Sequence, residues 1–403
     1  MEDSDNLRHR LREFVDAQVI PAEDALEDEA RAEQARARLR AAAKEAGLWA
    51  LPLPAEQGGA GLPLADYFEL AEDEGRSDHG PEALGSASLL NARMLAAHAD
   101  PGLRERILPG LVAGELHLAY AMTEPGVAGS DPHGLRTEAK QAQDGRWRIA
   151  GRKWFTSGAA RAGMILVVAR TETEDAAPRD SFSILAVPAE AAGFRIVREL
   201  DVLGAGGQYE IEFDQVTVPA AHLVGPRGGG LRLAGRRLAL GRTLRALRWI
   251  GQAQRAVELL AARVRERRLG AETLADRQLM QGLVFEAELQ VRGARLLTRQ
   301  AASLVAADRP STVEVSMAKV AAARALSTAA DSAIQAYGAE GLTAASGLPR
   351  LLRTARAARI LDGADELHIS GGARRLLRQY ATAGNQTGRA DDLVDDTIRG
   401  SGE

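Results

Sequence analysis

Apolar residues recur every three or four positions in the first and the last thirds of the chain, which is the period of amphipathic helices. Residues 1–114 follow this pattern, and it returns after residue 230 and lasts to about residue 383. The first helical part breaks where Gly and Pro cluster, at 47, 51–54, 57–63 and 100–102. In the last part the pattern predicts helices that include 250–264, 283–304, 313–337 and 349–360.

Between these parts, from about 118 to 224, the pattern changes to short alternating or wholly apolar runs separated by turn residues, which predicts strands. The clearest strand candidates are 146–150, 164–169, 182–187 and 209–213. We therefore expect an α+β multidomain fold: a helical domain, a middle β-domain built as a small barrel or sheet, and a C-terminal four-helix bundle. The predicted bounds are 1–117, 118–228 and 229–384, with a flexible tail over 385–403.

Composition narrows the chemistry. The 403 residues contain no cysteine, which excludes disulfides, thiolate catalysis and cysteine-bound metals. Lys and Arg number 51 against 55 Asp and Glu, so no overall positive charge attracts nucleic acid. No apolar run reaches the roughly 18 residues of a membrane span, and the acidic start of the chain lacks a signal-peptide core. We expect a cytoplasmic enzyme without membrane insertion.

Several common motifs are absent or incomplete. The glycine runs at 204–207 and 228–230 lack the spacing of a dinucleotide-binding loop between a strand and a helix, so both are interpreted as loops. Neither a phosphate-binding P-loop nor a nucleophile elbow occurs. The seven histidines are scattered without the spacing of metal ligands. The chemistry must therefore lie elsewhere.

The informative segment is YAMTEPGVAGSD at 120–131. Its residues predict a strand that ends in a Pro/Gly turn, with main-chain N–H groups and two hydroxyls free for a polar ligand. The small residues Gly126, Ala128 and Gly129 would let that ligand approach the backbone closely. Taken singly, each of these residues also fits an ordinary polar turn.

This segment resembles the signature of the acyl-CoA dehydrogenase family, in which a strand and turn bind a flavin. Further family-like motifs follow in the same order as in the family, and the resemblance covers roughly residues 7–383. The motifs are GRKWFTSG at 151–158, FDQVTVP at 213–219, Glu266-Arg267, Gln278, QAYG at 335–338 and RILDG at 359–363.

The resemblance implies bound FAD. It places the flavin pyrimidine near Tyr120, Met122 and Thr123, and the isoalloxazine near Trp154 and Thr156. Without the resemblance, Trp154 fits a core aromatic residue equally well. The FAD residues that the resemblance implies within one chain are Tyr120, Met122, Thr123, Gly129, Ser130, Trp154, Phe155, Thr156 and Glu366.

A second group of positions matches residues that reach the FAD of a neighbouring subunit, so the resemblance implies a homodimer or homotetramer. These positions are Arg267, Gln278, Gln335 and Gly338.

The resemblance also implies the catalytic group. Asp362 falls where many members carry a catalytic glutamate, in a run that is similar to the subgroup sequence Asp-Gly-Pro-Asp-Glu-Val-His. This carboxylate would remove the α-proton while the β-hydride passes to flavin N5. Ser130 and Arg242 would lie near the acyl thioester. The alternative for Asp362 is a helix cap or a surface acid beside a glycine turn.

Some positions depart from the family pattern. Asp362 is one methylene shorter than glutamate, and Gly241 occupies the base position that other members use. Ala239 replaces an acid near the substrate, and 270–271 and Ala339 depart from the motifs at the adenine end of the cofactor. The adenine contacts are therefore expected to differ from those of the family.

Together the residues predict a FAD-dependent α,β-dehydrogenase of an acyl thioester, carried by coenzyme A or a carrier protein. Its electrons would pass to an electron-transfer flavoprotein or another acceptor, as the resemblance suggests. One alternative is a flavin-dependent monooxygenase with the same fold, although a hydroxylase needs no base at Asp362. The other alternative is a non-catalytic helical scaffold.

Overall fold

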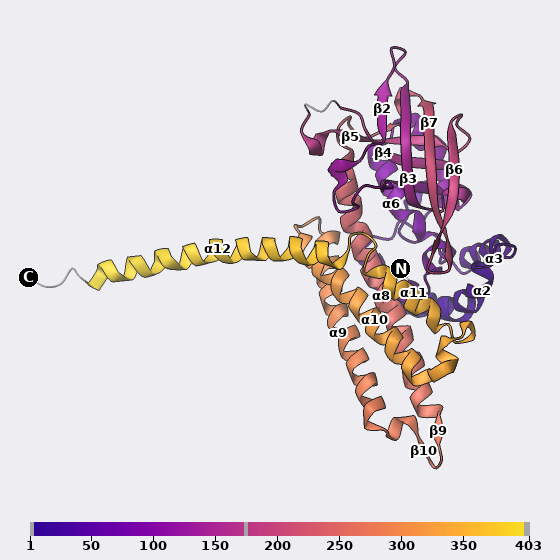
Figure 1. Cartoon of the computed structure of the whole chain (residues 1–403), viewed down its shortest axis with the longest axis vertical. Coiled ribbons are helices and arrows are strands. Elements are labelled where there is room, and N and C mark those ends of the chain that lie inside the picture. Colours follow the sequence, from indigo (N-terminus) through magenta and orange to yellow (C-terminus); the bar gives the residue numbers. More distant parts are fainter. Residues whose placement is uncertain (1–3, 173–175, 399–403) are drawn as a thin grey trace, which may run out of the picture.

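The computed structural model describes residues 4–172 and 176–398 (Figure 1). In chain order these residues form helices α1–α7, a sheet of strands β1–β8, and helices α8–α12. The sheet lies at one end of the molecule and the long helices α8, α9 and α10 extend away from it, side by side (Figure 1). This arrangement confirms the expected order of a helical, a β and a second helical domain. The residue numbers of the predicted boundaries remain predictions.

The predicted Gly and Pro breaks lie between helices, at 46–63 and at 99–100, whereas the breaks at 27–31, 75–79 and 84–88 were not predicted. Asp100 begins one helix by accepting a hydrogen bond from the Gly102 N–H at 2.9 Å, with Pro101 at the first helical position. Gly114 ends the same helix in the left-handed conformation, with φ of 73°. The helices are α1 (Ser4–Phe14), α2 (Glu23–Leu26), α3 (Ala32–Glu45), α4 (Leu64–Glu74), α5 (Gly80–Ala83), α6 (Leu89–His98) and α7 (Pro101–Ala113).

The sheet has the order β6-β7-β3-β2-β4-β5-β8, and β1 pairs in parallel with β4. The two wholly apolar runs form the central strands β4 and β5, which are buried on both faces. One face packs against the N-terminal helices and the other faces the core of the β-domain. The strands are β1 (Leu118–Ala121), β2 (Glu138–Gln141), β3 (Trp147–Ser157), β4 (Met164–Arg170), β5 (Phe182–Pro188), β6 (Phe194–Val202), β7 (Ala205–Val218) and β8 (Leu223–Val224).

One loop prediction was partly wrong. The glycine run at 204–207 forms a turn only up to Gly204, and β7 begins at Ala205. Gly206 and Gly207 lie within this strand and form neither a phosphate-binding loop nor a turn. The residues on either side, Ala205 and Gln208, pair with β6, and Gln208 also pairs with β3, so the strand continues through the two glycines despite their weak strand preference.

The C-terminal helices pack around α10, which contacts α8, α9, α11 and α12. Alanines make up most of the buried face of α10, and their small side chains let the neighbouring helices approach closely. A short hairpin of β9 (Arg268–Leu269) and β10 (Glu272–Thr273) joins α8 to α9 at the end remote from the sheet (Figure 1). The helices are α8 (Gly230–Glu266), α9 (Gln278–Ala306), α10 (Thr312–Tyr337), α11 (Leu348–Ala358) and α12 (Asp365–Ile398).

The last helix, α12, leaves the bundle and extends away from it (Figure 1). The segment expected as a flexible tail from residue 385 is part of this helix up to Ile398. Residues 399–403 of that predicted tail lie outside the described residues.

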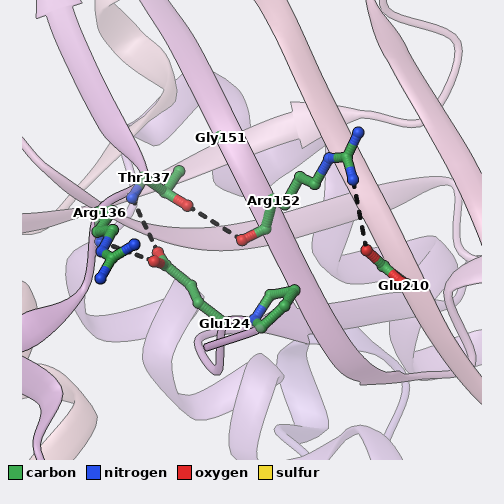
Figure 2. A pocket seen from close by; sticks show the side chains of 7 residues that line it. Glu124, Arg136, Thr137, Gly151, Arg152 and Glu210 are labelled. Atoms are coloured by element: carbon green, nitrogen blue, oxygen red, sulfur yellow. Dashed lines mark hydrogen bonds and ion pairs between the residues drawn. The ribbon is translucent and has the colours of Figure 1, made fainter. Parts of the chain in front are cut away.

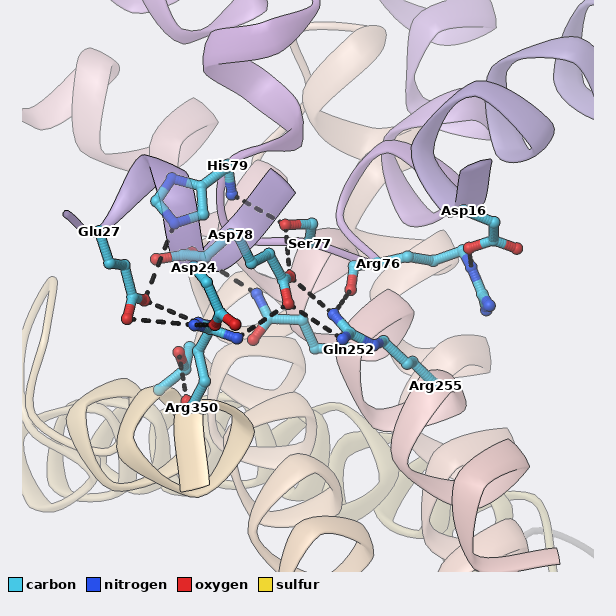
Figure 3. Close-up of polar contacts among 12 residues, drawn as sticks. Asp16, Asp24, Glu27, Arg76, Ser77, Asp78, His79, Gln252, Arg255 and Arg350 are labelled. Carbon is cyan, nitrogen blue, oxygen red and sulfur yellow. Dashed lines mark hydrogen bonds and ion pairs between the residues drawn. The ribbon is translucent and has the colours of Figure 1, made fainter. Parts of the chain in front are cut away.

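A polar network joins the N-terminal helices to the C-terminal bundle (Figure 3). Glu23, which is buried, accepts from Arg255 at 2.7 Å and from Arg350 at 3.1 Å. Arg350 also donates to Glu27 at 2.7 Å. Burial alone would raise the pKa of Glu27, but hydrogen bonds from His79 and Arg350 hold it well below its usual range. These pairs fix the two helical parts against each other.

Candidate active site

The segment after β1 is attached to strand β3 by two main-chain contacts. The Met122 carbonyl accepts a hydrogen bond from the Lys153 ammonium at 2.9 Å. The Thr123 carbonyl accepts from the Trp154 N–H at 3.0 Å. The turn that the sequence singled out therefore lies directly beside the GRKWFTSG motif.

Beneath this turn lies a buried ion pair between Lys153 and Glu124, at 2.7 Å. Glu124 also accepts the main-chain N–H groups of Arg136 at 2.7 Å and Thr137 at 2.9 Å. Burial lowers the pKa of Lys153 to about 8, although the Glu124 carboxylate opposes this shift. A cavity of about 230 Å³ opens beside Glu124, between the turn and strand β3 (Figure 2). The ion pair of Lys153 and Glu124 fixes the turn in place.

A β-bulge shapes the part of β3 that follows. The pairing of β3 with β7 shifts between Lys153 and Thr156, and Phe155 between them has a left-handed φ of 48°. Trp154 is half-buried, Thr156 is fully buried and Phe155 is 45% exposed. Bulges of this kind are frequent beside active sites because they redirect side chains.

Three buried polar atoms in this region have no hydrogen-bond partner among the described residues. They are the Tyr120 hydroxyl, the Trp154 indole N–H and the Thr156 hydroxyl. Native proteins rarely leave such groups unpaired, because each one costs about 1–3 kcal/mol. Burial also raises the pKa of Tyr120 to about 12, so its phenol stays protonated and able to donate. These atoms suit a planar ligand with polar ring edges, as FAD has.

Helix α8 connects this region to Asp362. Arg237 lies over the Tyr120 ring, 4.0 Å from its centroid. Farther along the same helix, Arg242 donates through Nε to the Asp362 carbonyl at 2.8 Å. Arg245 forms an ion pair with the Asp362 carboxylate at 2.7 Å. Arg237 and Arg242 are five residues apart, about 7.5 Å along the axis, so both parts belong to one site.

Asp362 occupies the connection between α11 and α12, with a left-handed φ of 55°. Its carbonyl accepts from Arg242 and also from His368 Nε2 at 3.1 Å. Because a carbonyl can only accept, the His368 proton sits on Nε2. Gly363 follows with φ of 101°, and a Cβ there would approach His368 Nε2 to 3.0 Å. Only glycine fits this position without strain.

The acid three residues after Asp362 has a structural role. Asp365 is buried and pairs with Lys319 at 3.0 Å and with Arg359 at 3.0 Å. It also lies in the first turn of α12, where a negative charge is favourable. Asp365 therefore anchors the start of α12 and keeps the connection that carries Asp362 in place.

The remaining predicted residues of the same chain lie near the surface. Gly129 and Ser130 are exposed in the turn after β1, and Thr123 is half-buried. Glu366 is exposed in the first turn of α12. Thr123 adjoins β3 through its carbonyl, and the assignment of all four residues to FAD stays a prediction.

The four residues predicted to reach a neighbouring subunit lie together, away from this site. Arg267, Gln278, Gln335 and Gly338 are all exposed at the ends of α8, α9 and α10, at the end of the bundle remote from the sheet (Figure 1). One chain does not bring these residues to Trp154 or Asp362.

The sequence did not identify Arg237 or Arg245 as site residues. The only available signal was the density of arginines in the first half of the helix that became α8. Such runs are usually solvated helix faces, so the pattern alone could not separate these two from their neighbours. Among the described residues, no group of His, Asp and Glu side chains is arranged for a metal ion, and no helix has both the length and the apolar composition needed to cross a bilayer.

A helical domain, a β-sheet domain and a second helical domain, in this order, make up the fold of the acyl-CoA dehydrogenases. The chain belongs to this family. Its residues 1–115, 119–216 and 228–377 match the family models for the N-terminal, middle and C-terminal domains of acyl-CoA dehydrogenase. It is thus an oxidoreductase of a FAD-dependent family.

Similar proteins and structures also belong to this family. The chain is 36% identical over 397 residues to the probable acyl-CoA dehydrogenase FadE2 of Mycobacterium tuberculosis, covering 93% of this chain and 96% of that one. It is 31% identical to human acyl-CoA dehydrogenase family member 11, covering 85% of this chain but only 45% of that longer protein. A crystal structure of a probable acyl-CoA dehydrogenase from Mycobacterium abscessus superimposes with a TM-score of 0.82 at 28% identity, covering 92% of this chain and 98% of that one.

Proposed function

We propose that this protein removes an α-proton and a β-hydride from an acyl thioester, with Asp362 as the base and FAD as the hydride acceptor. The observation that carries the proposal is the connection through α8, which joins the unpaired atoms around Tyr120 to the carboxylate of Asp362. The products are an α,β-unsaturated thioester, a protonated Asp362 and the reduced cofactor, so atoms and electrons balance.

The residues around β3 fit FAD. The Tyr120 hydroxyl, the Trp154 indole and the Thr156 hydroxyl would supply hydrogen bonds to the polar edge of the flavin. When bound, the flavin supplies the site with a two-electron acceptor. The chain's own contribution would be to hold the ring through residues of β1 and β3 and to keep water away from it.

The loop geometry supports Asp362 as the base. Its carbonyl is held by Arg242 and His368, and its carboxylate is paired with Arg245, so the residue is fixed from three sides. A base must be held within hydrogen-bond reach of the proton that it removes. Arg242, which the resemblance placed near the thioester, would contact the substrate close to this carboxylate.

A second copy of the chain would complete the cofactor site. Arg267, Gln278, Gln335 and Gly338 are exposed at the remote end of the bundle, where only another subunit could bring FAD to them. Helix α9 also exposes an apolar face, which is unusual for a monomer and typical of an interface between subunits. The exposed residues of that face are Leu279 (82%), Phe285 (70%), Leu289 (53%) and Leu296 (71%). We infer a homodimer or a homotetramer.

The physiological electron acceptor is part of the same proposal. An electron-transfer flavoprotein, or another acceptor, would oxidise the reduced cofactor.

Two measurements separate the proposal from its alternatives. Bound FAD in the purified protein distinguishes a dehydrogenase or a monooxygenase from a non-catalytic helical scaffold. Anaerobic bleaching of the flavin by an acyl-CoA, without oxygen consumption in air, then distinguishes a dehydrogenase from a monooxygenase. A protein that binds no FAD, or that needs oxygen to turn over, would contradict the proposal.

A further inference from the structure

Arg237 forms no ion pair with a carboxylate among the described residues. Its Nη2 donates to the amide oxygen of Asn91 at 3.1 Å, and its guanidinium lies over the Tyr120 ring. Its Nε is buried and has no hydrogen-bond partner among the described residues. The side chain is half-buried, and a guanidinium partly withdrawn from water without a carboxylate is costly, so an anion that binds there would be favoured.

Within residues 4–172 and 176–381, positive charges around Arg237 outnumber the free carboxylates. Arg242 and Arg245 follow it on α8, and the nearby carboxylate, Asp362, is already paired with Arg245. The next carboxylate, Asp365, is occupied by Lys319 and Arg359. Burial lowers the pKa of Arg237 and of Arg242, which is the behaviour of cations that lack enough compensating charge. The described part of the site therefore has an excess of positive charge.

We propose that Arg237 binds a carboxylate carried by the acyl chain, so that the preferred substrates are thioesters of dicarboxylic acids. The inference rests on the proposed function, because it takes Asp362 as the group beside the reacting carbons. Arg237 precedes Arg242 and Arg245 by five and eight residues, which is about 7.5 to 12 Å along α8. A free carboxylate at that distance from Asp362 would meet the unpaired Nε.

The test compares matched substrates on the FAD-loaded enzyme. Adipoyl-CoA and its methyl ester have the same chain but differ in the distal charge, and succinyl, glutaryl and suberoyl pairs vary the length. The wild type should bleach faster with the free acid of at least one pair. In Arg237→Met the ratio of acid to ester rates should fall roughly 10- to 100-fold, the value of a hydrogen bond to a charged group.

Two further variants make the result specific. Arg236→Met removes the same charge from the neighbouring exposed position and should leave the ratio as in the wild type. Arg237→Lys keeps the charge and should retain part of the preference, which also covers the case in which Arg237→Met fails to fold. Affinities for analogues with sulfur in place of the β-carbon, which cannot lose a β-hydride, should show the same ratios by calorimetry.

Two results would overturn the inference. The first is a wild type that prefers the methyl ester at every chain length. The second is an Arg237→Met variant in which acid and ester lose rate equally, which would assign Arg237 to the cofactor or to the fold. In both cases bleaching by esters leaves the proposed dehydrogenase intact. A wild type that no thioester bleaches contradicts the proposed function itself, and the inference with it.

Discussion

Arg242 and Asp362 lie 120 positions apart in the chain, and the Arg242 Nε donates to the Asp362 main-chain oxygen at 2.8 Å. The same oxygen accepts from His368. Asp362 needs this support because its left-handed backbone, with φ of 55°, is unfavourable for any residue except glycine and, to a lesser degree, Asn and Asp. The position of the proposed base therefore depends on α8, the first helix of the C-terminal bundle.

Removing this support should slow catalysis more than it weakens cofactor binding. We expect Arg242→Met to retain FAD and to lower the rate of flavin bleaching by about 10- to 100-fold, the value of a charged hydrogen bond. Hydrogen exchange of residues 359–366 should rise in the same variant. The exposed Arg236→Met is the control, with no change in either quantity. An unchanged exchange rate in Arg242→Met would remove Arg242 from this positioning role.

His368 should make the loop sensitive to pH. Burial, together with the Arg242 guanidinium, lowers the pKa of His368 below its usual value near 6.5. Below pH 6.5 the unfolded chain then binds more protons at this residue than the folded chain, so its contribution to stability falls as the pH falls. His368→Gln can still donate to the Asp362 carbonyl but does not titrate.

We therefore expect the difference in unfolding free energy between wild type and His368→Gln to shrink from pH 7.5 to pH 5.5. Urea unfolding at both values measures it. Other titrating groups near this loop, Lys319, Asp365 and Arg242, are common to both proteins and cancel. An equal difference in unfolding free energy at the two pH values would contradict a lowered pKa of His368 in the folded protein.

Breaking the buried ion pair of Lys319 and Asp365 should lower the free energy of unfolding strongly. Both side chains are almost fully buried. Lys319→Met would leave the Asp365 carboxylate with Arg359 as its one ion-pair partner among the described residues, and breaking a buried pair in this way costs about 3–5 kcal/mol. Lys319→Met combined with Asp365→Leu should recover much of that loss, because no buried charge then remains. A single variant as stable as the wild type would show that the pair contributes little.

Removing the unpaired polar groups near β3 should weaken FAD binding without destabilising the apoprotein. Replacing Tyr120 by Phe, Trp154 by Phe and Thr156 by Val should weaken FAD binding by about 1 kcal/mol per hydrogen bond. The apoprotein should be as stable as before or more so, because buried unpaired groups are removed. Dialysis against FAD and thermal unfolding of the apoprotein measure the two effects.

The control for this variant is Thr217→Val, on the exposed face of β7. It should change neither quantity. A triple variant that keeps FAD as tightly as the wild type would place the flavin elsewhere.

The fold was accessible from the sequence because its signals are local. The helical period and the Gly and Pro breaks located the helices, and the apolar runs at 164–169 and 182–187 became the central strands β4 and β5. The apolar stripe at 250–264 became part of a single helix of 37 residues, α8. The full length of α8 was not predicted, because its glycines at 235, 241 and 251 have a low helix propensity. In the folded chain, tertiary packing overrides that propensity.

The site was less accessible because it depends on contacts between distant segments. The bulge at Phe155 exists only in the pairing of β3 with β7, and the pair of Arg245 with Asp362 joins α8 to the connection after α11. No periodicity encodes either feature. The motifs identified Tyr120, Trp154, Thr156 and Asp362 only through resemblance.

Stopped-flow reduction of the flavin under anaerobic conditions tests the central claim most directly. An amide cannot accept the α-proton, so Asp362→Asn should keep FAD and thioester binding but lose bleaching by about 10²- to 10⁴-fold. Asp362→Glu should keep part of the rate, with a changed chain-length preference, because the carboxylate moves outward by one methylene. Asp362→Asn reduced by the best thioester at close to the wild-type rate would contradict the assignment of Asp362 as the base.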